Sequence, residues 1–206
     1  MSPEPLTISL HEFLRSRRSV RRFTDAPVDA EALERILESA TYAPNAHNRQ
    51  PWRFAVVSTP AAKSRLAEHM AADFRRALEA DGVMDEEIEA QIARSMARTE
   101  ETPVVVVLCA DFTVMDAYDD PVRNQGEHTM AMQSVALAGG QLLLAAHAEG
   151  LGGVWVCAPL FAPAQVRAAL DLPETWEPQG MLLLGHPAGE SKSRERRPVS
   201  DVTVYK

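Results

Sequence analysis

The 206-residue chain has few cysteines, no excess of positive charge and no obvious leader. Its two cysteines, Cys109 and Cys157, lie in apolar segments, so we expect reduced, buried thiols instead of a disulfide framework. The formal net charge of −8 argues against a nucleic-acid partner, because such binding depends on neutralising phosphates over a wide surface. Residues Met1–Pro5 lack the basic and apolar regions of a signal peptide, and no segment is predicted to span a membrane. These absences predict a cytoplasmic protein without a nucleic-acid or membrane partner.

The order of apolar and polar segments predicts an α+β fold. Helical periodicity or capping signals predict helices over 9–16, from Asp29 to about residue 40, 60–98 with a break near Gly82, 127–149 and 162–170. Apolar, β-branched runs predict strands over 54–57, 103–110, 154–157 and 180–185, and the tail at 202–205 alternates like a strand. No linker or repeat divides the chain, so residues 1–206 are predicted to form a single domain.

Two of the predicted helical segments have unusual surfaces. Segment 127–149 is apolar nearly all round and rich in small residues, which indicates a helix covered on every side, in part by a second subunit. Segment 60–98 has a sparse apolar stripe and dense charge. Two solvated surface helices are the simpler interpretation, and a lid over the core is the alternative.

The stretch Arg17–Phe23 holds four arginines and a serine in an otherwise acidic chain. Guanidinium groups and a hydroxyl can surround phosphate oxygens with charge-assisted hydrogen bonds, so this cluster indicates a fixed anion. The alternative is a solvated basic face on a short helix. A second basic cluster, at residues 192–197, lies near the other end of the chain.

The stretch Asn45–Trp52 is rich in amides and stands between a predicted helix end and a strand. Amides donate and accept hydrogen bonds in one plane, as recognition of a heterocyclic ring edge requires. A plain turn punctuated by proline is the alternative.

Other candidate chemistry is weaker. His47, His128 and His147 are isolated, and a lone histidine is more often structural, so no catalytic acid or nucleophile is predicted. The glycine run at 150–153 follows a helix instead of a strand and is therefore no dinucleotide fingerprint. No spacing of histidine, cysteine or carboxylate residues suggests a metal site.

Taken in order, these segments resemble the nitroreductase family of flavin enzymes. The resemblance is carried by Arg17–Phe23, by Ala43–Pro44 with Asn48 and Gln50–Trp52, by Gly150–Gly152, and by Arg196 with Pro198. A more specific similarity is to the flavin-binding C-terminal domain of the enzyme that completes the deazaflavin coenzyme by adding glutamate. It is carried by Glu127–Met130, Asp171–Pro173 and Trp176–Pro178, and the ligase half of that enzyme has no counterpart here.

The resemblance implies a mixed sheet surrounded by helices, an intertwined homodimer with one FMN at each of two interface sites, and a C-terminal segment that reaches the partner. The residues implied to bind FMN are Arg17, Arg18, Ser19, Val20, Arg21, Asn45, Asn48, Cys157 and Arg196. The N-terminal group and Arg196 would hold the phosphate, ribityl chain and ring edge, the two asparagines would flank the ring, and the Cys157 backbone would approach N5. Many relatives carry serine at Asn45 and glycine or an acidic residue at Cys157.

The resemblance further implies an FMN-dependent oxidoreductase that transfers hydride from NAD(P)H or a reduced deazaflavin to a small planar acceptor. The favoured acceptor is the dehydro form of a deazaflavin coenzyme precursor. One alternative is a general NAD(P)H-dependent nitroaromatic or quinone reductase. Another, of a different class, is a flavin or deazaflavin binding module without turnover.

Overall fold

The computed structural model of the protein describes residues 9–191 and 194–206. The leader prediction for Met1–Pro5 and Lys192 of the second basic cluster therefore lie outside the described residues. The helices are α1 (Leu10–Ser16), α2 (Ala30–Thr41), α3 (Pro60–Ala80), α4 (Asp85–Glu100), α5 (Pro121–Ala148) and α6 (Pro163–Leu170). The strands are β1 (Trp52–Val57), β2 (Val104–Asp111), β3 (Gly152–Val156) and β4 (Trp176–Gly185).

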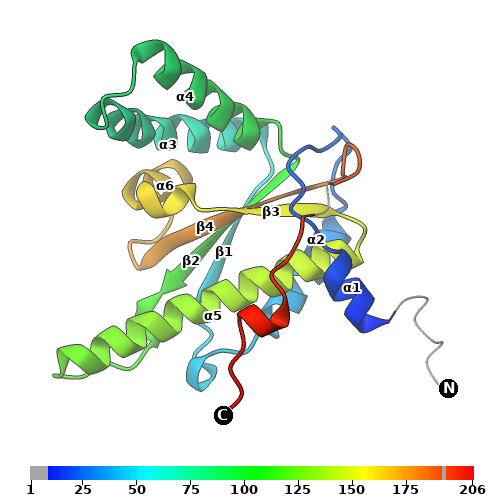
Figure 1. The fold of residues 1–206 in the computed structure, drawn as a ribbon. Helices are drawn as coiled ribbons and strands as arrows, with labels where there is room; N and C mark the ends of the chain where they lie inside the picture. Colours follow the sequence, from blue (N-terminus) through cyan, green and yellow to red (C-terminus); the bar gives the residue numbers. More distant parts are fainter. Residues whose placement is uncertain (1–8, 192–193) are drawn as a thin grey trace.

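The four strands form one sheet in the order β1-β2-β4-β3, with helices on both faces (Figure 1). Every pair of these strands is antiparallel, and the parallel element expected of a mixed sheet is a single bridge between Ser19 and Gly153. The register of β2 against β4 shifts after Leu108, where Pro178 enters the ladder. Proline lacks the N–H that a regular ladder needs, so it is expected at such an irregularity. The predicted α+β class is confirmed.

Helix starts follow local capping chemistry. The Ser9 hydroxyl accepts a hydrogen bond from the Glu12 amide, and the Asp29 carboxylate accepts one from the Ala32 amide, as predicted for two helix starts. Helix α5 begins at Pro121, well before the predicted Glu127. The side chain of Asp120 caps it, and a proline is favourable in the first turn because its missing N–H would have no partner there.

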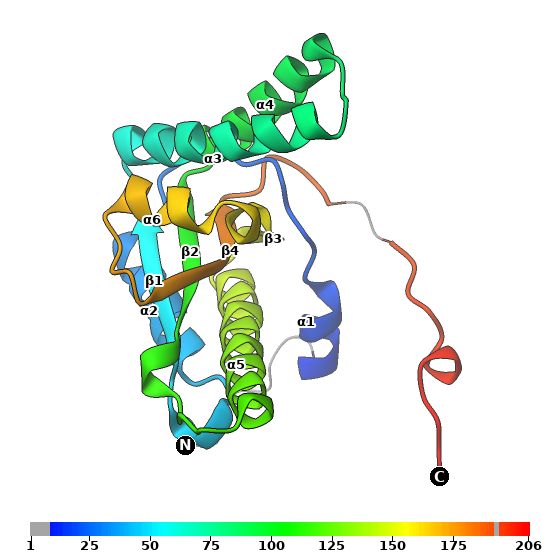
Figure 2. The same cartoon turned by 90° about the vertical axis from the view of Figure 1, so that its left-hand side faces the viewer.

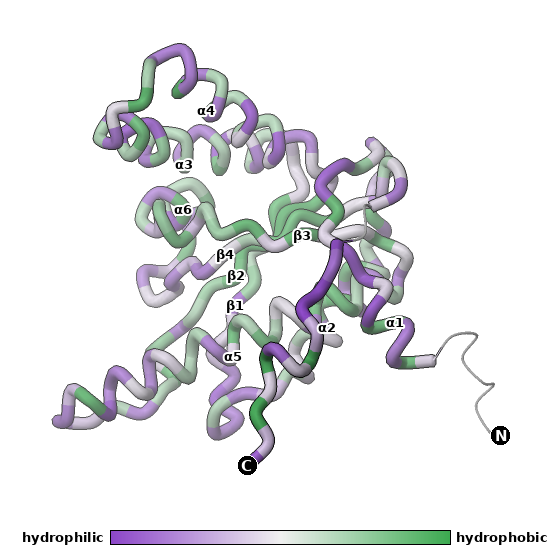
Figure 3. Tube along the Cα trace, viewed as in Figure 1, coloured by the Kyte–Doolittle hydropathy of each residue, from purple (hydrophilic) through white to green (hydrophobic). Residues whose placement is uncertain are grey.

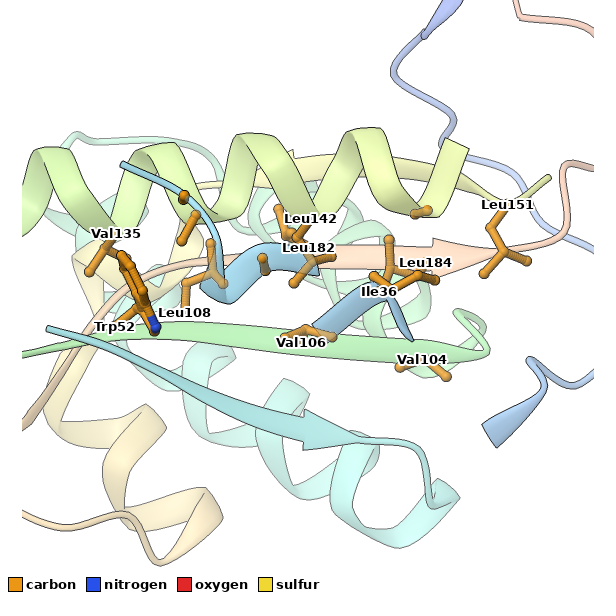
Figure 4. Packing of buried hydrophobic residues seen from close by; sticks show 14 of the residues in the cluster. Ile36, Trp52, Val104, Val106, Leu108, Val135, Leu142, Leu151, Leu182 and Leu184 are labelled. Carbon is orange, nitrogen blue, oxygen red and sulfur yellow. The ribbon is translucent and has the colours of Figure 1, made fainter. Parts of the chain in front are cut away.

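The larger core cluster lies between the sheet and helices α2 and α5 (Figure 4). Alternate residues of β2 and β4 supply the sheet side, because successive strand side chains point to opposite faces. Ile36 of α2 and Leu142 of α5 meet them and are fully buried. Burying one such side chain stabilises the fold by roughly 1.5–3 kcal/mol, so this layer fixes how α5 lies on the sheet.

The opposite face of the sheet packs against α3 and α6. Leu66 of α3 and Val166 of α6 are fully buried against the remaining β2 and β4 side chains. Beyond them, α3 and α4 form a hairpin with its own small cluster of Leu78, Ile88 and Ile92. The hairpin projects from the body and alternates between hydrophilic and hydrophobic residues, whereas the strands are mainly hydrophobic (Figure 3). Two surface helices are therefore present as predicted, and whether they act as a lid stays a prediction.

Helix α5 is only partly covered within one chain. Leu137 is 49% exposed, although the helix is apolar nearly all round. By length and hydropathy α5 would suffice to cross a bilayer, which corrects the expectation that no segment reaches that length. A helix buried in a protein core passes the same test, and α5 packs on the sheet. The exposed apolar side of α5 is the surface that a second subunit would cover, as predicted from the sequence.

The C-terminal segment leaves the body of the protein and ends away from it (Figure 2). It contains one turn of 3-10 helix at Val199–Asp201, and residues 202–206 form no strand, so the predicted β-like tail is wrong for the single chain. Val204 and Tyr205 are 77% and 87% exposed. An extended strand needs a neighbouring strand for its hydrogen bonds, and residues 9–191 and 194–206 of the single chain offer this segment none.

Candidate functional site

The basic cluster lies against the start of β3 and the end of β4. The Val20 amide donates a 3.0 Å hydrogen bond to the Gly153 carbonyl, and Phe23 bridges to Pro187. At Gly152 an added Cβ would lie only 2.7 Å from the Val20 Cβ, so glycine is required for this close approach. The backbone at Val20 is therefore fixed, and the arginines on either side of it project from that anchor.

A cavity of about 500 Å³ joins the two basic clusters. Its lining residues are Arg18, Ser19, Val20, Arg21, Arg22, Ala188, Gly189, Glu190, Ser191, Arg194 and Arg196. Five of them are arginines and one is acidic, so the electrostatic potential in the cavity favours an anion. The structure thus brings residues 18–22 and Arg194 and Arg196 to one cavity, and their role in binding FMN stays a prediction.

Two of these arginines already bond to nearby backbone. One Arg18 nitrogen donates to the carbonyls of Arg15 and Arg17, and one Arg196 nitrogen donates to the carbonyls of Arg194 and Glu195. Each guanidinium carries five N–H groups, so these bonds leave donors for an anion. The geometry and donor set fit the phosphate of a mononucleotide.

Arg17 lines an adjoining cavity of about 520 Å³ together with His147 of α5. The Ser16 hydroxyl lies 2.7 Å from His147 Nε2, and the Phe13 ring stacks on the imidazole at 5.0 Å. Burial lowers the pKa of His147, and the charges of Arg17 and Arg18 lower it further. His147 therefore links α1 to α5, and its lowered pKa favours the neutral imidazole.

The amide loop is rigidly built. The Asn45 side-chain oxygen accepts a 2.9 Å hydrogen bond from the Gln50 amide, and the Ala46 amide donates to the Ser134 hydroxyl of α5. His47, Asn48 and Gln50 all have positive φ angles near 50°. Non-glycine residues adopt this left-handed region at a cost, which the surrounding bonds must offset.

The amide loop and the basic cluster meet α5 at different places. The Ala46 amide of the loop donates to Ser134, and Ser16, which directly precedes the basic cluster, contacts His147 on the same helix. At 1.5 Å per residue these two anchor points are roughly 20 Å apart along α5. Within one chain, then, the predicted site residues Asn45 and Asn48 do not meet Arg17–Arg21.

Cys157 follows β3 and is exposed, so the expectation of two buried thiols is wrong for this residue. The strand ends at Val156, and the 3-10 turn at Ala158–Phe161 lifts the chain off the sheet. Cys109 is buried as expected, and burial raises its pKa to about 12. Cys157 lies four residues beyond Gly153, which is roughly 13 Å along a strand from the basic cluster.

Sequence reasoning missed part of the cavity. Arg22 and Arg194 line it and belong to the noted clusters, yet neither was among the predicted binding residues. Glu190 and Ser191 line it without any sequence signal, because only the bend after β4 brings them there.

His128 stacks on Phe112 with 4.3 Å between ring centroids, which suits a structural role.

Comparison with known proteins identifies the family. The model of the nitroreductase family matches residues 14–186, which include the basic cluster, the amide loop and the β3 segment. The chain belongs to the nitroreductase family. Nitroreductase relatives include an "NADH dehydrogenase" of Thermus thermophilus, 34% identical over 92% of both chains. A "5,6-dimethylbenzimidazole synthase" of Rhodospirillum rubrum is also 34% identical, over 90% of this chain and 82% of that protein.

Solved structures with the nitroreductase fold are similar to this chain over nearly its whole length. A Desulfovibrio desulfuricans protein assigned as a nitroreductase and solved in complex with FMN is 26% identical, with a TM-score of 0.73 and 98% of both chains covered. A BluB-like flavoprotein of Clostridium difficile has a TM-score of 0.79 at 22% identity, covering 97% of this chain and 99% of that one. The predicted fold and the predicted class, an FMN-dependent oxidoreductase of the nitroreductase type, are confirmed.

Proposed function

We propose that this chain binds FMN with Arg17, Arg18, Ser19, Val20, Arg21 and Arg196, and that the amides of Asn45 and Asn48 complete the site from a second copy. The observation that carries the proposal is the arginine-lined cavity built from both ends of the chain. Bound FMN supplies hydride-transfer chemistry, and the protein supplies orientation and charge. Residues 1–206 form one FMN-binding domain in this proposal.

In this proposal, different parts of the cofactor lie at the two ends of β3. Arginines at the Gly153 end bind the phosphate, because five of them line that cavity. Cys157, at the other end of the strand, lies where its backbone N–H would meet the flavin ring. Its exposure supports this placement, because nothing within the described chain covers it.

A homodimer explains three features of the single chain. The amide loop is about 20 Å along α5 from the basic segment, α5 has an uncovered apolar side, and the C-terminal segment leaves the body. In the dimer that we propose, residues of one copy contact different residues of the other reciprocally, so the amide loop of each copy lies beside the basic segment of its partner. The dimer stays a prediction, as does the cytoplasmic location.

Mixed dimers test this arrangement. We expect one variant, Arg17→Ala with Arg196→Ala, and another, Asn45→Ala with Asn48→Ala, each to lose flavin-dependent NADH oxidation. A mixed dimer of the two has one site with all its side chains intact, so about half of the wild-type activity per dimer should return. Two differently tagged copies, purified in tandem, provide the mixed dimer. Absence of recovery in a verified mixed dimer would contradict a shared site.

For the reaction, we propose transfer of hydride from NAD(P)H to a small planar acceptor. The sequence resemblance at Glu127–Met130 favours the dehydro form of a deazaflavin coenzyme precursor. The general nitroaromatic or quinone reductase is the alternative, and the Thermus relative named NADH dehydrogenase supports a nicotinamide donor. Steady-state turnover with both types of acceptor distinguishes the two functions. Comparable slow rates on many nitroaromatics, with no turnover of the deazaflavin precursor, would favour the general reductase.

Two further outcomes identify other functions. A binding module would hold FMN, yet NADH and NADPH would leave the bound flavin oxidised in an anaerobic assay.

The Rhodospirillum relative supports a second candidate activity, synthesis of 5,6-dimethylbenzimidazole. Chromatography of an aerobic incubation with FMN and NADH detects that product, whose formation would make this candidate the better one.

A further inference from the structure

A second cavity, of about 550 Å³, lies between the α3–α4 hairpin and the segment after β3. Three parts of the chain line it. They are Met70, Asp73, Phe74 and Ala77 of α3, Gln91, Arg94, Ser95 and Arg98 of α4, and Val156, Ala158, Phe161 and Ala162 around the 3-10 turn. Its size is typical of a site for a small molecule.

The two helices present different faces to this cavity. Helix residues three and four positions apart share one face, and both lining sets have that spacing. The face from α3 is mainly apolar, whereas the face from α4 is entirely polar. The hairpin's own core, at Leu78, Ile88 and Ile92, adjoins this cavity, and Phe74 packs against that core while it lines the cavity. The cavity is therefore an amphipathic slot beside the core that holds the two helices together.

The polar wall carries positive charge without a counterion. Arg94 and Arg98 are one turn apart and exposed, and among the described residues neither has a carboxylate within ion-pair distance. The other arginines of the hairpin are all paired. These pairs are Arg65–Asp171, Arg75–Glu89 and Arg76–Asp73. Asp73 is the acidic residue in the lining, and its pairing with Arg76 leaves the two α4 arginines for an anion.

Aromatic rings complete the cavity. Phe74 lines it from α3, and Phe161 stands at its rim with 81% of its surface exposed. A ring this exposed gains from a planar partner, because stacking removes apolar surface from water. The floor residues Val156 and Ala158 lie on either side of Cys157.

We propose that this cavity selects electron acceptors that join a planar aromatic body to an anionic group, with Arg94 and Arg98 binding the anion. The inference rests on the proposed function, because the cavity floor flanks the residue beside which we place the flavin ring. Arg94 and Arg98 act as specificity residues: they bind the far end of the acceptor and leave the reacting end toward Cys157.

The test compares 4-nitrobenzoate with its neutral analogue 4-nitrobenzamide on FMN-loaded protein. The variant is Arg94→Gln with Arg98→Gln. The matched control is Arg35→Gln with Arg75→Gln, which removes the same charge from exposed ion pairs outside the cavity. Equilibrium dialysis gives the dissociation constants, and kcat/KM for NADH consumption gives the kinetic effect.

We expect the cavity variant to bind 4-nitrobenzoate about ten-fold or more weakly, since charge-assisted bonds to carboxylate are lost. Binding of 4-nitrobenzamide should change by less than about two-fold, and the control should resemble the wild type. Phe161→Ala should weaken both ligands equally, because the ring contacts the part that they share. Equal affinities of the wild type for the two ligands, or equal losses in the cavity variant, would overturn the proposal.

Two outcomes distinguish a failure of the cavity proposal from a failure of the proposed function. If NADH fails to bleach the flavin, the proposed function fails, while dialysis still reports whether the arginines bind the anion. If bleaching is normal and the variant keeps its preference for 4-nitrobenzoate, the cavity proposal alone fails. A slower bleaching by NADH with unchanged acceptor binding would assign the arginines to the donor and overturn the proposal.

Discussion

The two ends of the sheet are built on different principles. At the amide end, Arg53 Nη2 pairs with Asp111 Oδ2 at 2.9 Å. Burial works against the charge on Asp111, but hydrogen bonds from Thr113 and the charge of Arg53 outweigh it and lower the pKa of this carboxylate. At the basic end, Arg21 and Arg22 are exposed. One end is complete without a ligand, and the other concentrates charge that a ligand phosphate would neutralise.

The largest expected effect comes from removing that charge. Arg17→Ala with Arg196→Ala should weaken FMN binding by about 100-fold or more, because each charge-assisted bond contributes roughly 1.5–3 kcal/mol. Thermal unfolding with excess FMN should shift down accordingly, since a ligand stabilises only the state that binds it. Fluorescence titration of FMN measures the effect, and the control with Arg35→Ala and Arg75→Ala should bind normally. Stoichiometric flavin in the double variant would contradict the assignment.

A smaller effect should follow from displacing the basic segment without changing its charge. In Gly152→Ala the new methyl group meets the Val20 side chain at 2.7–2.8 Å, so the segment must move. Overpacking of this kind costs about 1–3 kcal/mol, and we expect FMN affinity to fall about ten-fold. Gly126→Ala, in α5 with no atom within 4 Å of the added Cβ, is the control and should bind normally. Unchanged FMN affinity in Gly152→Ala would show that the anchor at Val20 does not position the arginines.

Substitutions in the amide loop should change the free energy of unfolding. Asn45→Ala removes the acceptor for the Gln50 amide and should lower the free energy of unfolding by about 1 kcal/mol. Asn48→Asp should leave that free energy nearly unchanged, because aspartate tolerates the positive φ of this position and no hydrogen bond of the Asn48 side chain occurs in the part of the chain that the structure describes. Urea denaturation of the flavin-free protein compares the two. Equal losses would mean that the loop is not held by Asn45.

The smallest effect concerns pH. Because the folded-state pKa of His147 is lowered, the unfolded chain binds the proton more readily. The contribution to stability is therefore full above the ordinary value of 6.5 and is lost as the pH falls through the lower folded value. Melting temperatures of flavin-free protein between pH 7 and 5 should fall less steeply in His147→Gln than in wild type. Parallel curves would show that His147 does not titrate with folding.

Local signals in the sequence predicted most of the fold. The caps at Ser9 and Asp29 and the β-branched run of β2 produced the expected elements. Helix α5 starts earlier than the predicted residue 127, because Asp120 and Pro121 form a helix start and the polar residues that follow them lack an apolar period. The first half of β4 was missed because Pro178 enters the strand at a register shift that no local pattern reveals.

The site was harder to predict than the fold. The sequence indicated that Arg17–Arg21 and Arg196 would meet, and the cavity joins Arg196 to the basic segment. It did not indicate that the loop of Asn45 contacts the middle of α5, away from the basic segment at the C-terminal end of that helix, because that separation depends on how the helix packs on the sheet. The exposure of Cys157 depends on the turn that follows β3, and the second cavity depends on how the α3–α4 hairpin lies over that turn.

The contrast between the two sulfur atoms gives the protein a built-in reporter. A maleimide dye should modify Cys157 alone, because the Cys109 thiol is buried and its pKa is about 12. One fluorophore per polypeptide would then stand beside the place where the flavin ring and the acceptor are proposed to lie. Slower labelling after addition of FMN would locate the chromophore without a crystal.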